Sequence, residues 1–198
     1  MAAALTLNAT AAVWKDPTTG YSWRYNIVGG GAEIVEIDFA PVGHLTVPSR
    51  MDDIEVTRIG NDAFVLSGLG SITIPDSVES IGGEAFFGCD KLRDVYIGAG
   101  LSSFGGVPFT ACPELRSFTV SKNNLSFKSV SGMLLSKDGN VLLRGVNGDV
   151  MIPNGVTEIA DYAFGSLNRL KRVLIPDSVV QIGYLSFFNG FLSVKMAT

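Results

Sequence analysis

The chain is poor in the residues that most often carry chemistry. Its 198 residues include one histidine, His44, and two cysteines, and only 17% of them are charged. A single histidine supports neither a catalytic triad nor a histidine-based metal site, because both need further groups placed beside it. The net charge of −4 argues against a nucleic-acid partner, which would require a basic surface. We therefore expect no enzyme, no cofactor and no metal site.

Long apolar runs are missing too. No stretch of 18 apolar residues occurs, so we expect no insertion into a membrane. The first residues are apolar but carry no Lys or Arg, and they lack the charged start of a secretory signal. We expect residues 1–20 to form a flexible N-terminal segment. The hydrophobic share of 46% is nevertheless enough to bury a sizeable core.

What the chain does contain is an internal repeat of about 23 residues. Ile81-Gly82 followed by Ala85-Phe86 returns along the chain with the same apolar side chains at the same offsets. The counterparts are Ile59 with Phe64, Phe104 with Phe109, Ile159 with Phe164, and Ile182 with Phe187. Self-similarity at such a period is typical of a solenoid, in which each unit buries its apolar face by stacking on its neighbours.

Each unit has the same predicted course. Leu92-x-x-Val95-x-Ile97 predicts a short strand with Val95 and Ile97 inward, because side chains alternate along a strand. A proline such as Pro75 then ends the strand and begins a turn. Ala85-Phe86 predicts a short helical turn whose ring fills the interior of the coil.

The repeat resembles a known family. The pattern L-x-x-I-x-I-P-x-S-V-x-x-I-G-x-x-A-F-x-x-C-x-x-L, read from Leu69 to Leu92, is similar to the BspA-like leucine-rich repeat and covers roughly residues 44–190. The resemblance implies a strand-dominated α/β solenoid with a parallel sheet of short strands on its concave face and short helical turns and loops opposite. It also implies a bacterial or protist protein of the cell surface or the extracellular space, used for adhesion or protein binding and without a catalytic site.

The first 43 residues precede the repeats. Residues 21–43 alternate aromatic and polar side chains around a glycine turn, which predicts a hairpin that caps the first coil. An aromatic ligand site at Trp23 and Tyr25 is the alternative. The repeats then occupy residues 44–198, and extra residues within 49–53 should form a loop.

The repeats are interrupted at about residues 121–149. There Met133 to Leu143 predicts a hairpin that turns at Asp138-Gly139. Such an insertion is either a structural elaboration or a binding flap. The last unit ends in apolar residues without a polar cap, so we expect end-to-end or edge-strand self-association as one possible interaction.

Cys89 and Cys112 lie one repeat apart and should occupy equivalent positions on adjacent coils. Such a spacing permits a disulfide. The favoured interpretation is that both are free thiols that fill small inward positions as buried hydrophobic residues.

The candidate binding surface is the outward face of the strands. Two rows of side chains should cross the sheet, one beside the other. The first row is His44, Ser71, Asp94, Ser117, Asp149 and Arg172, and the second is Thr46, Thr73, Tyr96, Thr119, Met151 and Leu174. Within them, the candidate ligand-binding residues are Ser71, Thr73, Asp94, Tyr96, Ser117, Thr119, Arg172 and Leu174.

Solenoids hold extended partners on such a face, so we expect a protein or glycan ligand. Tyr96 is the expected anchor, and Asp94 and Arg172 would set a charge preference. For any single residue the alternative is ordinary solvated sheet surface. For the whole chain, the alternative function is a structural spacer or stalk within a larger surface protein.

Overall fold

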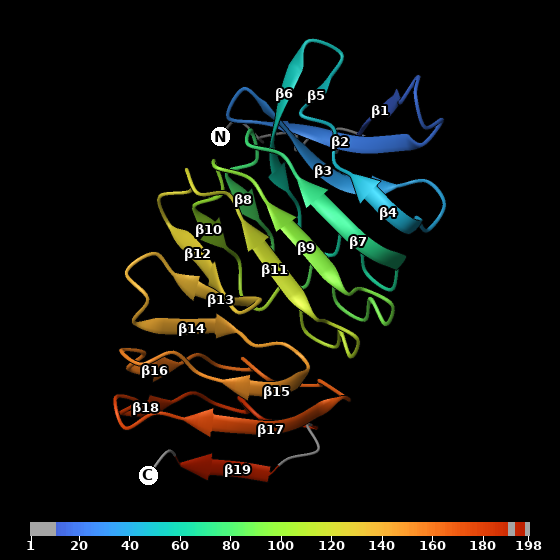
Figure 1. Ribbon diagram of the computed structural model, residues 1–198. Helices are drawn as coiled ribbons and strands as arrows, with labels where there is room; N and C mark the ends of the chain where they lie inside the picture. Colours follow the sequence, from blue (N-terminus) through green and yellow to red (C-terminus); the bar gives the residue numbers. More distant parts are fainter. Residues whose placement is uncertain (1–10, 190–192, 197–198) are drawn as a thin grey trace, which may run out of the picture.

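The structure is a computed structural model that describes residues 11–189 and 193–196. Its coils stack along one axis, from the N-terminal strands at one end to β19 at the other (Figure 1). All regular secondary structure in the described residues is strand. Among these residues, no helix has the length and apolar character that crossing a membrane requires.

Each coil contributes one strand to a front side of the stack, and the front strands pair in parallel. The first front sheet contains β4 (Val42–Thr46), β7 (Gly68–Ile74), β9 (Asp94–Ile97) and β11 (Ser117–Val120). The second contains β15 (Gly148–Met151), β17 (Leu170–Ile175) and β19 (Ser193–Met196). The parallel sheet of short strands is thus confirmed, but it is divided into two pieces.

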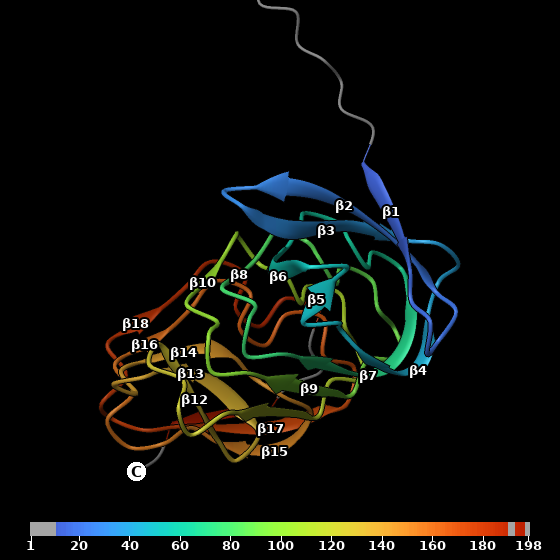
Figure 2. The same cartoon turned by 90° about the horizontal axis from the view of Figure 1, so that it is seen from above.

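A second set of strands lines another side of the coils, the back side. The first back sheet joins β1 (Ala12–Lys15), β2 (Ser22–Val28), β3 (Gly31–Ile37), β6 (Ile54–Ile59), β8 (Ser80–Ile81) and β10 (Ser103–Phe104). The second joins β12 (Phe127–Val130), β13 (Met133–Ser136), β14 (Val141–Arg144), β16 (Glu158–Ile159) and β18 (Gln181–Ile182). Figure 2 shows front strands β7 and β9 and back strands β8 and β10 on different sides of the coil.

The front strands form as the alternation predicts. In β9, Val95 and Ile97 are buried, whereas Asp94 is half-buried and Tyr96 is exposed. The chain leaves the strand through a proline turn that its own backbone closes, because Val78 N donates to Pro75 O at 3.2 Å. The same turn follows Pro153 and Pro176 in later coils.

The predicted short helical turns are wrong. Residues 61–66 form turns in which Phe64 N donates to Ala85 O and Leu66 N to Phe87 O, both at 2.8 Å. These amides bond to the next coil, whereas a helix would bond them to its own preceding turn. Asp62 and Leu66 also have φ of 56°, which a right-handed helix does not contain.

The interior of each coil is filled by the phenylalanine of this turn, and we call residues 61–66 and their equivalents the Phe turn. Phe64, Phe86 and Phe109 stack with ring centroids 5.1 Å apart at each step and planes only 6° from parallel. Phe164 stacks in the same way on Phe187, at 5.2 Å. The rings thus form a single file within each half of the molecule, and this file is broken between Phe109 and Phe164.

The hairpin cap is present as β2 and β3, and β3 pairs in parallel with β6 of the first coil. Trp23 and Tyr25 are buried, and the Trp23 ring packs edge-on against Phe64. They are core residues, so the aromatic ligand site proposed for them is wrong. Ala12–Lys15, expected to be flexible, forms β1 on the cap, while residues 1–10 of the expected segment lie outside the described residues.

The insertion contains the predicted hairpin, in which β13 and β14 pair antiparallel across residues 137–140. An additional strand, β12, pairs with β13. The shorter insertion near residue 50 also forms a small hairpin, because β5 (Arg50–Met51) pairs with β6. Its Met51 side chain turns back into the core and is fully buried.

Cys89 and Cys112 are free and fully buried, as the favoured interpretation predicted. Their thiols donate to backbone carbonyls of the preceding coil, Cys89 Sγ to Phe64 O and Cys112 Sγ to Phe86 O. The hydrogen bond with Cys89 and burial together raise the pKa of the Cys112 thiol. Cys112 is therefore a buried, protonated part of the core.

Candidate binding surface on the front sheet

The first front sheet aligns the outward side chains in two rows. The strand registers pair His44 with Ser71, Ser71 with Asp94, and Asp94 with Ser117. They equally pair Thr46, Thr73, Tyr96 and Thr119. Six of the eight candidate residues, Ser71, Thr73, Asp94, Tyr96, Ser117 and Thr119, thus lie together on three adjacent strands.

Hydrogen bonds link these rows across the strands. His44 Nδ1 lies 2.8 Å from Ser71 Oγ, and His44 Nε2 lies 3.5 Å from Thr73 Oγ1. The imidazole also packs edge-on against the Tyr96 ring, with centroids 6.4 Å apart. Ser117 Oγ donates to Asp94 Oδ1 at 2.7 Å. These contacts orient the exposed side chains, so the surface is partly organised before any partner binds.

Arg172 and Leu174 lie elsewhere. They belong to β17 of the second front sheet, where their partners on β15 are Asp149 and Met151. Arg172 Nε forms an ion pair with Asp149 Oδ1 at 3.7 Å. The expectation of rows that run unbroken from His44 to Leu174 is therefore wrong, because no strand pairing joins β11 to β15.

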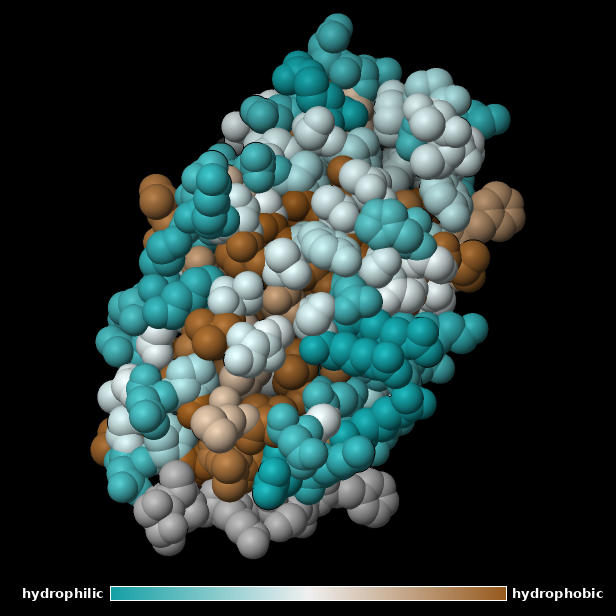
Figure 3. Space-filling model, viewed as in Figure 1, coloured by the Kyte–Doolittle hydropathy of each residue, from teal (hydrophilic) through white to brown (hydrophobic). Residues whose placement is uncertain are grey.

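A charged cluster at the rim of the front side was not foreseen from the sequence. Three arginines surround the half-buried carboxylate of Glu114: Arg169 at 3.0 Å, Arg116 at 3.8 Å and Arg93 at 3.9 Å. Hydrophilic side chains gather over the starts of β9, β11, β15 and β17 (Figure 3). The available signal was an arginine beside the repeated leucine, after it at Arg93 and Arg116 and before it at Arg169.

Asn147 joins the two front sheets near this cluster. Its Nδ2 donates to Pro113 O and Leu115 O at 2.8 and 2.9 Å, on the coil before the insertion. Its Oδ1 accepts from Arg169 N at 2.8 Å, on the coil after the insertion. One side chain therefore bridges the place where the strand ladder stops.

The chemistry available on the front face is hydrogen bonding, aromatic contact and charge pairing. Within residues 11–189 and 193–196, no group of three or more His, Cys, Asp or Glu side chains is arranged to hold a metal ion. His44 is hydrogen-bonded to hydroxyl groups only. The geometry thus suits a surface that recognises a partner by contact.

Comparison with known proteins identifies the repeats. A family model described as the BspA type leucine rich repeat region matches in six copies, over residues 50–132 and 147–196. The unmatched residues between these two ranges contain β13 and β14. Among curated proteins, none matches this chain.

Several solved structures are similar to this chain. The leucine rich repeat protein of T. pallidum is 22% identical with a TM-score of 0.55, over 88% of this chain and 82% of that one. A leucine rich cell surface protein of Faecalibacterium prausnitzii is 20% identical with a TM-score of 0.39, over 87% and 72% of the two chains. The pneumococcal vaccine antigen PcpA is 16% identical with a TM-score of 0.41, over 96% and 70%. The T. pallidum likeness supports the shared repeat architecture.

Proposed function

We propose a function from one premise: this chain belongs to the family of BspA-type leucine-rich repeat proteins. In this proposal the chain is a non-catalytic binding module, located at the cell surface or outside the cell. It holds a protein partner on the outward face of β4, β7, β9 and β11. A glycan is the alternative ligand of the same face.

The observation that carries the proposal is the alignment of side chains on this face. Tyr96 is 42% exposed at the middle of the sheet, with the His44 ring beside it. A tyrosine held in place by neighbours loses little conformational freedom on binding, which is why tyrosines are frequent anchors of interfaces. Asp94 is the acidic group nearest to it in the adjoining row, and Ser117 already holds its carboxylate.

The second front sheet would play a separate part. Arg172 and Leu174 are displaced from Tyr96 by the joint between the sheets, so a partner that reaches both must extend along the stack. Because Asp149 already pairs with Arg172, a partner must compete for that guanidinium group. We therefore place the anchor on Tyr96 and a secondary contact on Arg172.

The test begins with a panel of immobilised proteins and glycans to which the full chain is applied. For any partner captured, Tyr96→Ala should weaken binding at least about tenfold, the usual loss at an interface anchor. Tyr184→Ala is the matched control, because Tyr184 is exposed but lies on a Phe turn away from the front face. Equal binding by both variants, with intact circular dichroism spectra, would place the contact elsewhere.

A structural spacer is the second candidate. The ring stacks and the parallel ladders hold successive coils in a fixed relation, as a spacer requires. The spacer is favoured if the panel yields no partner while a longer protein that carries this chain binds one through another domain. An antibody against the chain that labels intact source cells would support the surface location in either case.

A further inference from the structure

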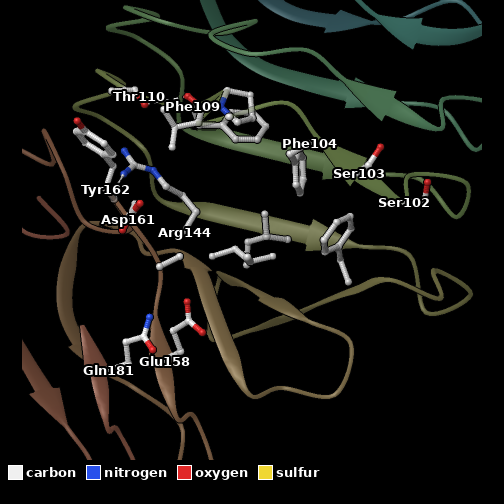
Figure 4. A pocket seen from close by; sticks show the side chains of 17 residues that line it. Ser102, Ser103, Phe104, Phe109, Thr110, Arg144, Glu158, Asp161, Tyr162 and Gln181 are labelled. Atoms are coloured by element: carbon white, nitrogen blue, oxygen red, sulfur yellow. Dashed lines mark hydrogen bonds between the residues drawn. The ribbon is translucent and has the colours of Figure 1, made fainter. Parts of the chain in front are cut away.

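A cavity of about 650 Å³ opens on the side of the molecule where the insertion interrupts the stack. Its walls come from the Phe turn at residues 106–110 on one side and from residues 160–162 on the other (Figure 4). Between them, the coil that contains the insertion has no full Phe turn. Arg144 and Gly145 occupy that place, and Gly145 N donates to Ala163 O at 2.7 Å.

The missing turn leaves two backbone donors without acceptors. In the preceding coil, Phe86 N donates to Pro108 O at 2.9 Å and Gly88 N donates to Thr110 O at 3.2 Å. The equivalent amides one coil later belong to Phe109 and Ala111, and neither donates a hydrogen bond within the described part of the chain. Since these amides face the next coil, they point to the place of the missing turn, and of the two residues Phe109 lines the cavity.

Arg144 supplies a third donor group and a positive charge. Its side chain lines the cavity, and the residue is only 6% exposed. The guanidinium group donates hydrogen bonds to Tyr162 O, Ala163 O and Gly165 O. In other coils, backbone amides of the Phe turn donate the equivalent hydrogen bonds to the next coil. Here the guanidinium group of Arg144 donates them instead. Its Nε is buried without a hydrogen-bond partner in the described residues.

No carboxylate of the described residues forms an ion pair with Arg144. Burial lowers the pKa of Arg144 to about 10, so the guanidinium group stays charged at neutral pH. A buried charge without a counterion is costly, and an anion placed beside it would recover part of that cost.

The rest of the lining is mostly apolar. Phe104 and Phe127 pack with centroids 4.7 Å apart and ring planes tilted by 39°, and Leu134 and Leu143 also line the cavity. Two carboxylates also reach the cavity. Glu158 lies on the side away from Phe109 (Figure 4), and Asp161 is held by Tyr184 N at 2.6 Å. Both acids would repel any negative charge on a ligand, so a carboxylate is held only where the donors of Phe109, Ala111 and Arg144 outweigh this repulsion, and polyanions are disfavoured.

We propose that this cavity binds a ligand that carries a single carboxylate on an apolar body. The carboxylate would accept hydrogen bonds from Phe109 N and Ala111 N beside the Arg144 guanidinium group, and the body would pack against Phe104 and Leu143. A free aliphatic or aromatic acid has this chemistry, and so does the C-terminal end of an apolar peptide. The site is separate from the front sheet and does not depend on the function proposed for it.

The test is an NMR titration of the full ¹⁵N-labelled chain. The probes are 4-phenylbutyrate and its neutral match 4-phenylbutanamide, followed by an apolar tripeptide with a free or an amidated C-terminus. The carboxylates should shift the amide signals of Phe109 and Ala111 and bind at least about tenfold more tightly than the amides, because hydrogen bonds to a charged group are stronger. Binding of 4-phenylbutyrate alone would identify a small acid as the ligand, and binding of the free tripeptide alone would identify a protein C-terminus.

A variant that fills the cavity completes the test. Because Arg144 also holds three carbonyls of the next coil, the substitution is made at Thr110, which lines the cavity and is only half-buried. Thr110→Trp should abolish the shifts, whereas Thr18→Trp, on an exposed loop of the cap, should preserve them. Equal binding of acid and amide, or no shift at Phe109 and Ala111 with either carboxylate, would overturn the proposal.

Discussion

Replacing Phe86 by alanine tests whether the stacked rings hold the coils together. Phe86 is fully buried and lies between Phe64 and Phe109, with both centroid distances at 5.1 Å. The substitution removes the ring and leaves a cavity bounded by two rings that no longer touch. The column of stacked rings between the cap and the insertion is then interrupted at this coil.

The expected loss in the free energy of unfolding is about 3–5 kcal/mol, the usual cost of truncating a buried phenylalanine. Two aromatic contacts of about 0.5–1.5 kcal/mol each are included in that loss. A domain is stable by about 5–15 kcal/mol, so the variant should lose a large share of its stability. For a chain of this length the melting temperature should fall by about 10 °C.

Urea unfolding measures the effect, with far-ultraviolet circular dichroism and tryptophan fluorescence as independent probes. Trp23 reports on the stack directly, because its ring lies 6.2 Å from Phe64 in an edge-on contact. The control is Phe39→Ala, since Phe39 is 88% exposed and should change stability by no more than about 0.5 kcal/mol. A loss at Phe86 below about 1 kcal/mol, or no larger than that at Phe39, would refute the reasoning.

Two further predictions concern the interrupted region. Gly145→Ala should destabilise the chain by about 1–3 kcal/mol in urea unfolding, because its Cβ would overlap the Phe164 ring, whereas Gly70→Ala meets only ordinary contact distances and should cost less. The hydrogen bond from Ser136 lowers the pKa of Asp138 despite its exposure. The stabilisation that the Asp138 carboxylate gives to the β13–β14 turn should therefore be fully present above the ordinary carboxyl pKa and disappear as the pH falls through the lowered value. An NMR pH titration of the turn amides measures this transition, and Asp138→Asn should abolish it.

The repeat period made much of the fold predictable. Because equivalent residues recur about one coil apart, the pairing of Thr73 with Tyr96 and of Ser71 with Asp94 could be read from the sequence. The inward positions and the proline turns followed from the same spacing, whereas the cap and the hairpin at Asp138-Gly139 followed from local strand and turn signals. Six of the eight candidate residues accordingly lie where the rows predicted them.

Other features depend on neighbours that a single repeat does not contain. The Ala-Phe step is compatible with a helical turn, and only the carbonyls of the next coil decide that Phe64 N bonds outward. The insertion has no counterpart in the other units, so the division of the front sheet could not be read from the period. Arg144 acquires its role for the same reason, since it replaces donors of a turn that is missing.

The bridge made by Asn147 has a mechanical consequence. Elsewhere in the stack, a pull on one coil is shared among several backbone hydrogen bonds of the next. At the joint between β11 and β15 the strand ladder stops, and the front sheets are linked there by the Asn147 side chain and by two backbone hydrogen bonds, Asn147 N to Leu115 O at 3.0 Å and Asn168 N to Pro113 O at 3.4 Å. Under tension or bending, the molecule should deform first at this joint and behave as two stiff blocks connected by a flexible joint.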